Sequence, residues 1–260
     1  MKNKFNFDFK FNFDFKFAEG SRHVKLLPIK VRLGFTLAEV LITLGIIGVV
    51  AAITIPALLT NLNNRHTESI LREDYSILQQ MMTSANDDGA ISNFSVDKMN
   101  NMKYMREWFE TYFLPYIKVA NVCYDTKGCW IDDAKYPNGT SAAGGVVTAT
   151  GCGGTTISFQ LYNGSSICMD DYKVALFGVY GIKSDEASLV FYLDTNGNKK
   201  PNVVGKDIFV FAYKPDIEKI VPAGFDRTAA EIERNCSKRG NGFWCVMLIK
   251  NRGWKIPRLK

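Results

Sequence analysis

The sequence predicts an α+β protein in which one long N-terminal helix packs on a head built around an antiparallel β-sheet. Residues 35–59 form an apolar run long enough for a helix across a bilayer, and an amphipathic pattern continues this helix to residue 86. In the second half of the chain, four short segments rich in β-branched and aromatic residues are separated by turn residues. These features divide the chain into residues 1–34, 35–86 and 87–260.

The leader before the apolar run carries most of the positive charge. The 260-residue chain has a formal net charge of +6, and residues 1–34 contribute +5 of it. The nearly neutral remainder predicts no nucleic-acid partner. Because the basic flank precedes the apolar run, the positive-inside rule places the leader in the cytoplasm and the head outside. Within the leader, a Phe-rich unit repeats over residues 4–17, which indicates low-complexity sequence.

The apolar run contains one charged side chain, Glu39. As a helix, residues 40–59 would span about 30 Å, one hydrocarbon thickness. A carboxylate is costly in a bilayer, and intramembrane acids usually mark functional pairs. A signal peptide cut after residues 49–51, or an uncleaved signal anchor, would leave this acid unexplained. A further alternative is an interfacial acid at the helix start, favoured by the helix dipole.

The stretch GFTLAEVLITL, from Gly34 to Leu44, resembles the cleavage and methylation signature of type IV pilins and of type II secretion pseudopilins. The resemblance implies that a prepilin peptidase cuts between Gly34 and Phe35 and that the new Phe35 amine is methylated. It also implies that Glu39 neutralises the Phe35 amine of a neighbouring subunit and so sets the register of a filament. Pro56 falls where these proteins have a helix kink, and proline removes a backbone hydrogen bond.

The resemblance implies a pilin-like fold and a structural subunit of a pilus or a secretion pseudopilus, not an enzyme. The protein would enter the bacterial inner membrane as a single-pass chain and then join copies of itself and other pilin-like subunits. The only histidines are His23 and His66, so the head has no Ser-His or Cys-His pair. Two alternatives remain: a minor pilin that binds a ligand or DNA, and a membrane-anchored enzyme such as a glycosidase with paired carboxylates.

An amphipathic stripe continues the helix beyond the apolar run, so one face is expected to pack against the head. Its members are Leu71, Tyr75, Leu78, Met82 and Ala85. Polar residues and a glycine at 86–89 predict the stop. Residues 97–120 predict a second helix, and the glycine-rich residues 121–155 predict a loop. The apolar residues expected to face inward on the second helix are Met102, Met105, Trp108, Phe109, Tyr112 and Phe113.

Four segments predict the strands of the sheet: residues 155–162, 174–182, 188–194 and 207–213. After them, residues 228–240 predict a helix with a Thr-x-x-Glu capping box and a glycine stop. The apolar segment that closes the chain, from residue 242, is expected to be buried.

All six cysteines follow the apolar run, and an even number on one side of a membrane predicts disulfides in an oxidising compartment. Buried free thiols and a zinc site are the alternatives, although no Cys-x-x-Cys pair is present. Six cysteines allow many connectivities. The candidate pairs are Cys123 with Cys129, Cys152 with Cys168, and Cys236 with Cys245.

One stretch of the head concentrates oxygen ligands between two predicted strands. Its candidate ligands are Asp194, Asn196, Asn198 and Asp207, with Asn202 nearby. Carboxylate and amide oxygens suit calcium, but the glycine and glutamate positions do not match an EF-hand loop. The stretch resembles one found in pseudopilin-like heads, some of which hold calcium. A polar hairpin, in which Asn and Gly satisfy turn geometry, is the alternative.

Overall fold

The computed structural model describes residues 34–154, 156–172, 176–184, 186 and 188–257. Apart from Gly34, the predicted leader and its repeat lie outside the described residues. The chain divides into two units, Met1–Ala52 and Ile53–Lys260. The described part of the first unit is the start of one long helix, and the second unit contains the rest of that helix and the head.

The long helix, α1, spans Leu37–Asp87 and confirms the helix predicted for residues 35–86. Pro56 lies inside it, and the Thr60 hydroxyl donates to the Pro56 carbonyl at 2.9 Å. The helix ends where Gly89 adopts a φ of +87°, the left-handed conformation that commonly follows a helix. The predicted stop is therefore confirmed.

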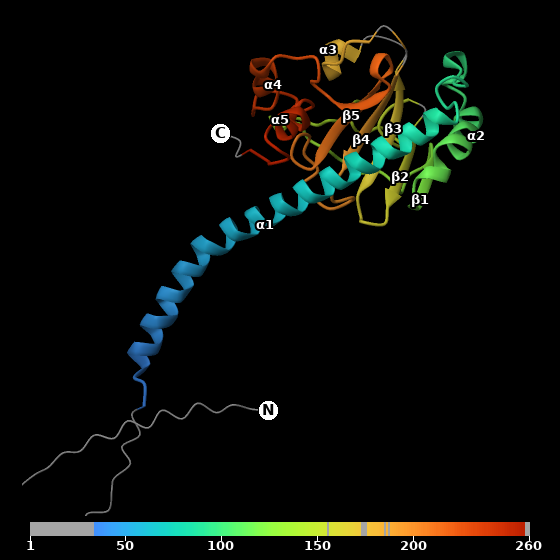
Figure 1. Ribbon diagram of the computed structural model, residues 1–260. Helices are drawn as coiled ribbons and strands as arrows, with labels where there is room; N and C mark the ends of the chain where they lie inside the picture. Colours follow the sequence, from blue (N-terminus) through green and yellow to red (C-terminus); the bar gives the residue numbers. More distant parts are fainter. Residues whose placement is uncertain (1–33, 155, 173–175, 185, 187, 258–260) are drawn as a thin grey trace, which may run out of the picture. The chain divides into compact units, whose positions relative to one another are not determined.

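The second half of α1 packs on the sheet, and Figure 1 shows it lying across one sheet face. The predicted stripe is confirmed, because Tyr75 is half-buried and its other members are buried. Tyr75 stacks on Phe211 of the sheet, with ring centroids 5.4 Å apart. The Tyr75 hydroxyl also donates to the Ile220 carbonyl at 3.3 Å. The Gln79 side-chain amide donates to the same carbonyl, so apolar packing and polar contacts together hold the helix on the sheet.

The sheet is a six-stranded antiparallel meander in which each strand pairs with the next along the chain. This arrangement confirms the predicted antiparallel sheet and the α+β class. The strands are β1 (Val119–Tyr124), β2 (Ile157–Leu161), β3 (Ser166–Tyr172), β4 (Ser188–Asp194), β5 (Ile208–Lys214) and β6 (Lys219–Pro222). Strands β2, β4 and β5 correspond to three of the four predicted strands.

Both faces of the central strands are covered. Phe191 pairs with Phe211 in the register of β4 and β5, on the face that meets Tyr75 of α1. Tyr192, one residue further, points to the opposite face, where its ring lies 6.4 Å from that of Phe243. Every residue of β4 and β5 is consequently buried, which explains why these strands read as continuous apolar segments.

The second helix is shorter than predicted. Instead of residues 97–120, α2 spans Met102–Tyr112, between the 3-10 helices η1 (Val96–Lys98) and η2 (Leu114–Tyr116). Asn101 caps its start by accepting from the backbone N–H groups of the second and third helical residues. Four of the six expected inward residues, Met105, Trp108, Phe109 and Phe113, are buried, and Met102 and Tyr112 are half-buried.

The expected strand at residues 174–182 is wrong, because the described residues there form helix α3, Leu176–Tyr180. Gly181 ends α3 with a φ of +67°, and its N–H donates to the Phe177 carbonyl at 3.0 Å. A Cβ at Gly181 would lie 2.9 Å from the Gly224 Cα, so this close approach requires glycine.

Three strands were not predicted. Strand β1 lies where the sequence favours the end of a helix and a loop, and as an edge strand it has mostly half-buried or exposed residues. Strand β3 contains Asp170 and Asp171, a residue type that is depleted in strands, yet Asp170 is buried. Strand β6 has only four residues and ends in Pro222, which an edge strand tolerates.

The C-terminal part follows the predicted order of a helix and a buried segment. Helix α4, Ala229–Asn235, follows the 3-10 helix η3 (Pro215–Ile217) and strand β6, and it has the predicted capping box between Thr228 and Glu231. It ends at Asn235, earlier than the predicted glycine stop, because Cys236 leaves the helical conformation. Helix α5, Cys245–Asn251, buries the apolar closing segment.

The structure confirms all three candidate disulfide pairs: Cys123 with Cys129, Cys152 with Cys168, and Cys236 with Cys245. None of the six cysteines is left as a free thiol or a zinc ligand. The second pair links the glycine-rich segment to β3, and the third links the end of α4 to the start of α5. Covalent links therefore fix the segments with the least regular structure to the sheet and helices.

One buried acid connects α1 to the turn between β2 and β3. Asp74 is fully buried, and its Oδ1 accepts from the Asn163 side-chain amide at 2.7 Å. In the described structure its Oδ2 has no hydrogen-bond partner. Burial raises the pKa of Asp74 from its ordinary value of 3.8 to about 6, although the Asn163 hydrogen bond opposes this shift.

We expect Asp74 to destabilise the folded protein as the pH rises from about 4 to about 7. Its pKa is higher in the folded state, so the stabilisation from protonation is complete below pH 4 and is lost as the pH passes 6. The free energy of unfolding should fall by about 3 kcal/mol across this pH range. Urea unfolding of the full chain in detergent, with Asp74→Asn for comparison, should show a stability difference that changes across this window.

Asp97→Asn, at an exposed position, is the matched control. Its stability difference from the wild type should remain constant between pH 4 and 7. A constant difference for Asp74→Asn as well would contradict the assignment.

Candidate functional site

Thr36 and Glu39 close the start of α1 with a capping box. The Thr36 backbone N–H and hydroxyl donate to Glu39 Oε2 at 2.8 and 2.9 Å, and the Glu39 N–H donates back to the Thr36 hydroxyl at 3.2 Å. The Thr36 carbonyl accepts the first backbone bond of the helix from Val40. Thr36 is therefore the N-cap, and Glu39 satisfies a backbone donor that the helix leaves unpaired.

The capping box uses only one of the two carboxylate oxygens of Glu39. Both bonds end on Oε2, and in the described part of the chain Oε1 accepts no hydrogen bond. An ionised carboxylate can accept several hydrogen bonds. Glu39 can therefore cap its own helix and bind a cation at the same time.

Gly34 and Phe35 precede the N-cap in non-helical backbone. The Phe35 side chain is 88% exposed, and no atom of the described residues lies within 4 Å of where a Gly34 Cβ would be. The peptide bond predicted to be cut thus lies in open, non-helical chain. Sequence reasoning missed the role of Thr36, although Thr36-x-x-Glu39 has the same pattern as the capping box of α4.

A continuous apolar surface follows the capping box. The large apolar side chains from Phe35 to Leu62 are between 42% and 88% exposed. Within α1, the most apolar window has a mean hydropathy of 2.5, and α1 is the helix in the described residues whose length and composition permit it to cross a membrane. Soluble monomers rarely expose so large an apolar surface. This part of α1 is compatible with a single-pass membrane anchor.

The loop between β4 and β5 brings several of the predicted oxygen ligands together. The Asp207 carboxylate accepts from the backbone N–H groups of Asn202 and Val203 at 2.8 and 2.6 Å, and from the Asn196 amide at 3.2 Å. The Asn196 backbone N–H donates to Asp194 Oδ1 at 3.1 Å. The two acids therefore organise the loop from its two ends.

Three buried oxygens in this loop have no hydrogen-bond partner in the described structure. They are Asp194 Oδ2, Asn196 Oδ1 and Asn202 Oδ1. Burial raises the pKa of Asp194 to about 8, and burial also raises the pKa of Asp207, against the hydrogen bonds that it accepts. Buried acceptors without a donor are costly. The loop thus contains oxygens that a cation would satisfy.

The structure places the predicted ligands unequally. Asp194 and Asp207 are buried, Asn196 is half-buried, and Asn198 is exposed. Asn202 joins the cluster instead, with a φ of +50° and an amide that donates to Asp133 at 3.2 Å. The described residues contain no group of three or more His, Cys, Asp or Glu that could hold a metal, so any site here combines two carboxylates with amide oxygens.

This donor set fits calcium, which takes carboxylate, amide and backbone oxygens in flexible geometry. The residues that would hold the ion are Asp194, Asn196, Asn202 and Asp207. The polar-hairpin alternative accounts for the turn, and the three buried oxygens without donors in the described structure favour a bound cation. When bound, calcium would supply positive charge for the buried Asp194 and would stiffen the loop.

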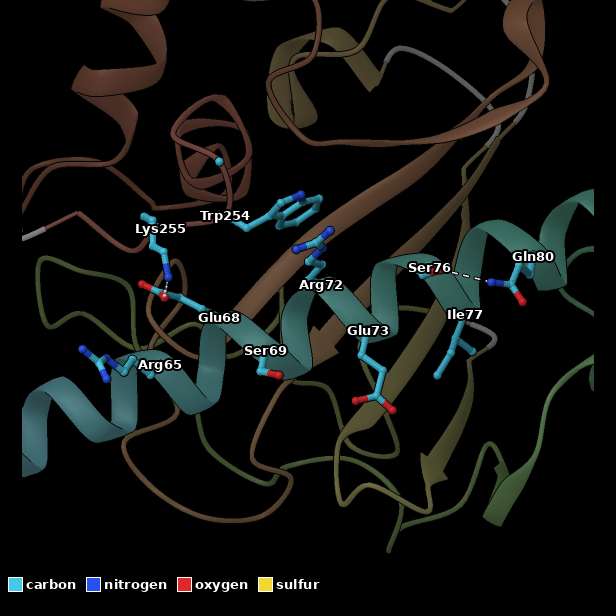
Figure 2. A pocket seen from close by; sticks show the side chains of 11 residues that line it. Arg65, Glu68, Ser69, Arg72, Glu73, Ser76, Ile77, Gln80, Trp254 and Lys255 are labelled. Carbon is cyan, nitrogen blue, oxygen red and sulfur yellow. Dashed lines mark hydrogen bonds and ion pairs between the residues drawn. The ribbon is translucent and has the colours of Figure 1, made fainter.

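A groove of about 860 Å³ runs beside the second half of α1, where the C-terminal segment returns to the helix. Figure 2 shows Glu68 of α1 facing Lys255, whose Nζ lies 2.8 Å from a Glu68 oxygen. The other Glu68 oxygen accepts from the Ile256 backbone N–H at 2.9 Å. These contacts fasten the C-terminal segment to α1. Basic, acidic and hydroxyl side chains line the groove.

Comparison with known proteins gives one family. The profile of DUF6613, a family of unknown function, matches residues 57–259, which cover the second part of α1 and the head. No curated protein and no solved structure matches the chain significantly.

We expect calcium to raise the melting temperature of the full chain in detergent. At about 100 times the Kd, binding stabilises a protein by about 2.7 kcal/mol. For a head of this size, this corresponds to a rise of roughly 5–10 °C. Chelation should reverse the rise, and magnesium should give a smaller one, because it demands rigid octahedral geometry.

Asp194→Asn should abolish the calcium-dependent rise while it preserves the side-chain shape. Asn198→Ala, in the same loop but at an exposed position, should retain the rise. An equal calcium response in the wild type and Asp194→Asn would contradict the site.

Proposed function

This chain belongs to DUF6613, a family of unknown function, and we propose that it is a structural subunit of a helical filament, either a type IV pilus or a type II secretion pseudopilus. The observation that carries the proposal is the arrangement at residues 34–39. A glycine and an exposed Phe35 in non-helical chain directly precede a capped helix whose only early charge is Glu39. Its resemblance to the prepilin signature gives each of these residues a role.

Cleavage after Gly34 would create a cationic amine at Phe35, and both charges would then lie at the start of an apolar helix. Such charges are tolerated in lipid when they meet an opposite charge. Glu39 Oε1 accepts no hydrogen bond in the described chain, so it is available to the Phe35 amine of a neighbouring subunit. The pair would neutralise both groups and fix the axial register between subunits.

The exposed apolar part of α1 supports the same proposal. In the membrane it is covered by lipid, and in a filament it is covered by equivalent helices of other copies. Head-to-tail contacts that do not close into a ring generate an open helical assembly. The α+β architecture, with the second half of α1 on an antiparallel sheet, leaves the apolar part available for these contacts.

The proposed partners are a prepilin peptidase, copies of this chain and other pilin-like subunits. The proposed location is the bacterial inner membrane, with residues 1–34 in the cytoplasm and the head outside, and afterwards a filament. Three disulfides support an oxidising compartment for the head. The protein is proposed to act by assembly, with Pro56 at the kink expected in the helix and without catalysis or nucleic-acid binding.

Intact-mass measurement of the protein from its native membrane should detect processing. We expect the mass to fall by that of residues 1–34, to rise by one methylene unit for N-methylation, and to show six oxidised cysteines. Gly34→Val should keep the unprocessed mass, since the signature requires a small residue at the cut. Gly45→Ala is the matched control, because Gly45 also has open space around its Cβ position. An unprocessed wild-type chain in cells that contain the peptidase would overturn the proposal.

Glu39→Gln separates the capping role of Glu39 from its charge. Glutamine also serves in a capping box, so the helix start should persist while the charge pair is lost. We expect processing to continue and the yield of sheared filaments, or of crosslinked subunit ladders, to fall at least tenfold.

Thr36→Ala provides the complementary control. It removes the cap, at a cost of about 1 kcal/mol, and retains the charge. Its filament yield should stay near that of the wild type. Normal assembly of Glu39→Gln, together with failure of Thr36→Ala, would show that capping and not charge pairing is the function of this acid.

A further inference from the structure

A polar pocket of about 420 Å³ lies between α1 and two loops of the head. The α1 side is formed by polar residues that include Thr60, Asn63 and His66. The β2–β3 turn and the β4–β5 loop form the other side. All of these residues belong to the second unit of the chain, so the pocket is a feature of the head and of the helix segment packed on it.

Three lysines from the β4–β5 loop line this pocket: Lys199, Lys200 and Lys206. Lys200 forms an exposed ion pair with Asp133 at 3.6 Å. Among the described residues, the other two form no ion pair. Asp207 also lines the pocket, but its oxygens accept three hydrogen bonds from the loop. Two of the three lysines therefore have no ion-pair partner in the described structure.

On α1, the pocket overlaps the last turn of the apolar surface. Leu58, Leu59 and Leu62 are more than half exposed, and the predicted membrane run ends at residue 59, directly before Thr60. From Thr60 to Asn64 the helix rises about 6 Å. One headgroup layer of a bilayer is roughly 5–7 Å thick. The lining residues on α1 therefore lie at the depth of the lipid phosphates when the apolar run is in the membrane.

The β2–β3 turn carries a second feature typical of a membrane interface. Tyr162 is 78% exposed, beside Asn163, which lines the pocket. Tyrosine is enriched at the headgroup level, because its ring is apolar and its hydroxyl is polar. Three lysines and polar residues of α1 thus line the pocket, and an exposed tyrosine directly precedes one of its lining residues in the sequence.

We propose that this pocket binds the phosphodiester headgroup of an anionic phospholipid. The lysines would supply positive charge to the phosphate, and Thr60 and Asn63 would supply hydrogen-bond donors to the phosphate and glycerol oxygens. A zwitterionic lipid is disfavoured, because its cationic group would face the same lysines. The inference rests on the proposed membrane insertion. It adds a specific lipid contact that holds the head on the bilayer before the subunit enters a filament.

Lipid titration of the full chain in non-ionic detergent, followed by native mass spectrometry, tests this contact. The probes are phosphatidylglycerol and phosphatidylcholine with identical acyl chains. The wild type should prefer phosphatidylglycerol. The triple variant Lys199→Gln, Lys200→Gln and Lys206→Gln should lose roughly a hundredfold in affinity for it, since each lysine near a membrane surface contributes about fivefold.

A matched triple variant, Lys103→Gln, Lys118→Gln and Lys219→Gln, removes three exposed lysines elsewhere on the head and should bind lipid like the wild type. Melting temperatures of both variants should remain unchanged, because the substituted side chains are exposed. Equal binding of the two lipids by the wild type would overturn the inference. Retained preference in the pocket variant would also overturn it. Complete displacement of lipid by inorganic phosphate would instead assign the pocket to a free anion.

Carbonate extraction of cell membranes distinguishes failure of this inference from failure of the proposed function. A chain that resists extraction but does not discriminate between the lipids would lack the lipid site and keep its membrane role. A chain that carbonate extracts would not be inserted, and both proposals would fall. Glu39→Gln should leave the lipid preference intact, because Glu39 does not line the pocket.

Discussion

The uncovered apolar surface between Phe35 and Leu62 is the constraint on which the rest of the structure depends. No described part of the chain covers it, and in the proposed function lipid or other helices do so. The head is built around the continuation of the same helix, whose buried stripe packs on the sheet. One element therefore connects the surface that needs a partner to the core that stabilises the head.

Much of the fold could be predicted, because long periodic segments carry strong signals. The stripe on α1, the buried strands β4 and β5, and the capping box of α4 all depend on local patterns, and all are confirmed. Of the elements that were not predicted, β1 and β6 lie at the sheet edges, α3 is short, and β3 is a central strand. Strand β3 was not predicted because it contains two acids, and α3 was predicted as a strand because its segment is rich in β-branched and aromatic residues and its five helical residues are too few to show a helical period. Tertiary contacts decide such segments, and one sequence does not reveal those contacts.

The candidate sites were predicted as far as residue types allow. Asp194 and Asp207 were found because acids and amides cluster between two strands, and the structure brings them into one loop. Asn202 lies in the cluster and Asn198 does not, because of the backbone path of the loop. This path includes a left-handed residue and a contact with Asp133. The lysine pocket could not be found from sequence, because it forms only when α1 packs beside two turns. Long-range packing creates this charge cluster.

The cap at Thr36 also determines the backbone conformation that a peptidase would meet at the bond between Gly34 and Phe35. Proteolytic enzymes bind their substrates as extended chain, and a peptide bond inside a helix is held by its own backbone hydrogen bonds. The helix here starts at Leu37, and the bonds of its first turn end at Thr36. The bond between Gly34 and Phe35 therefore lies just outside the hydrogen-bonded ladder. Removal of the leader would break none of these bonds, and the mature protein would keep the same first turn. Its new charged amine would lie at Phe35, one residue before the N-cap.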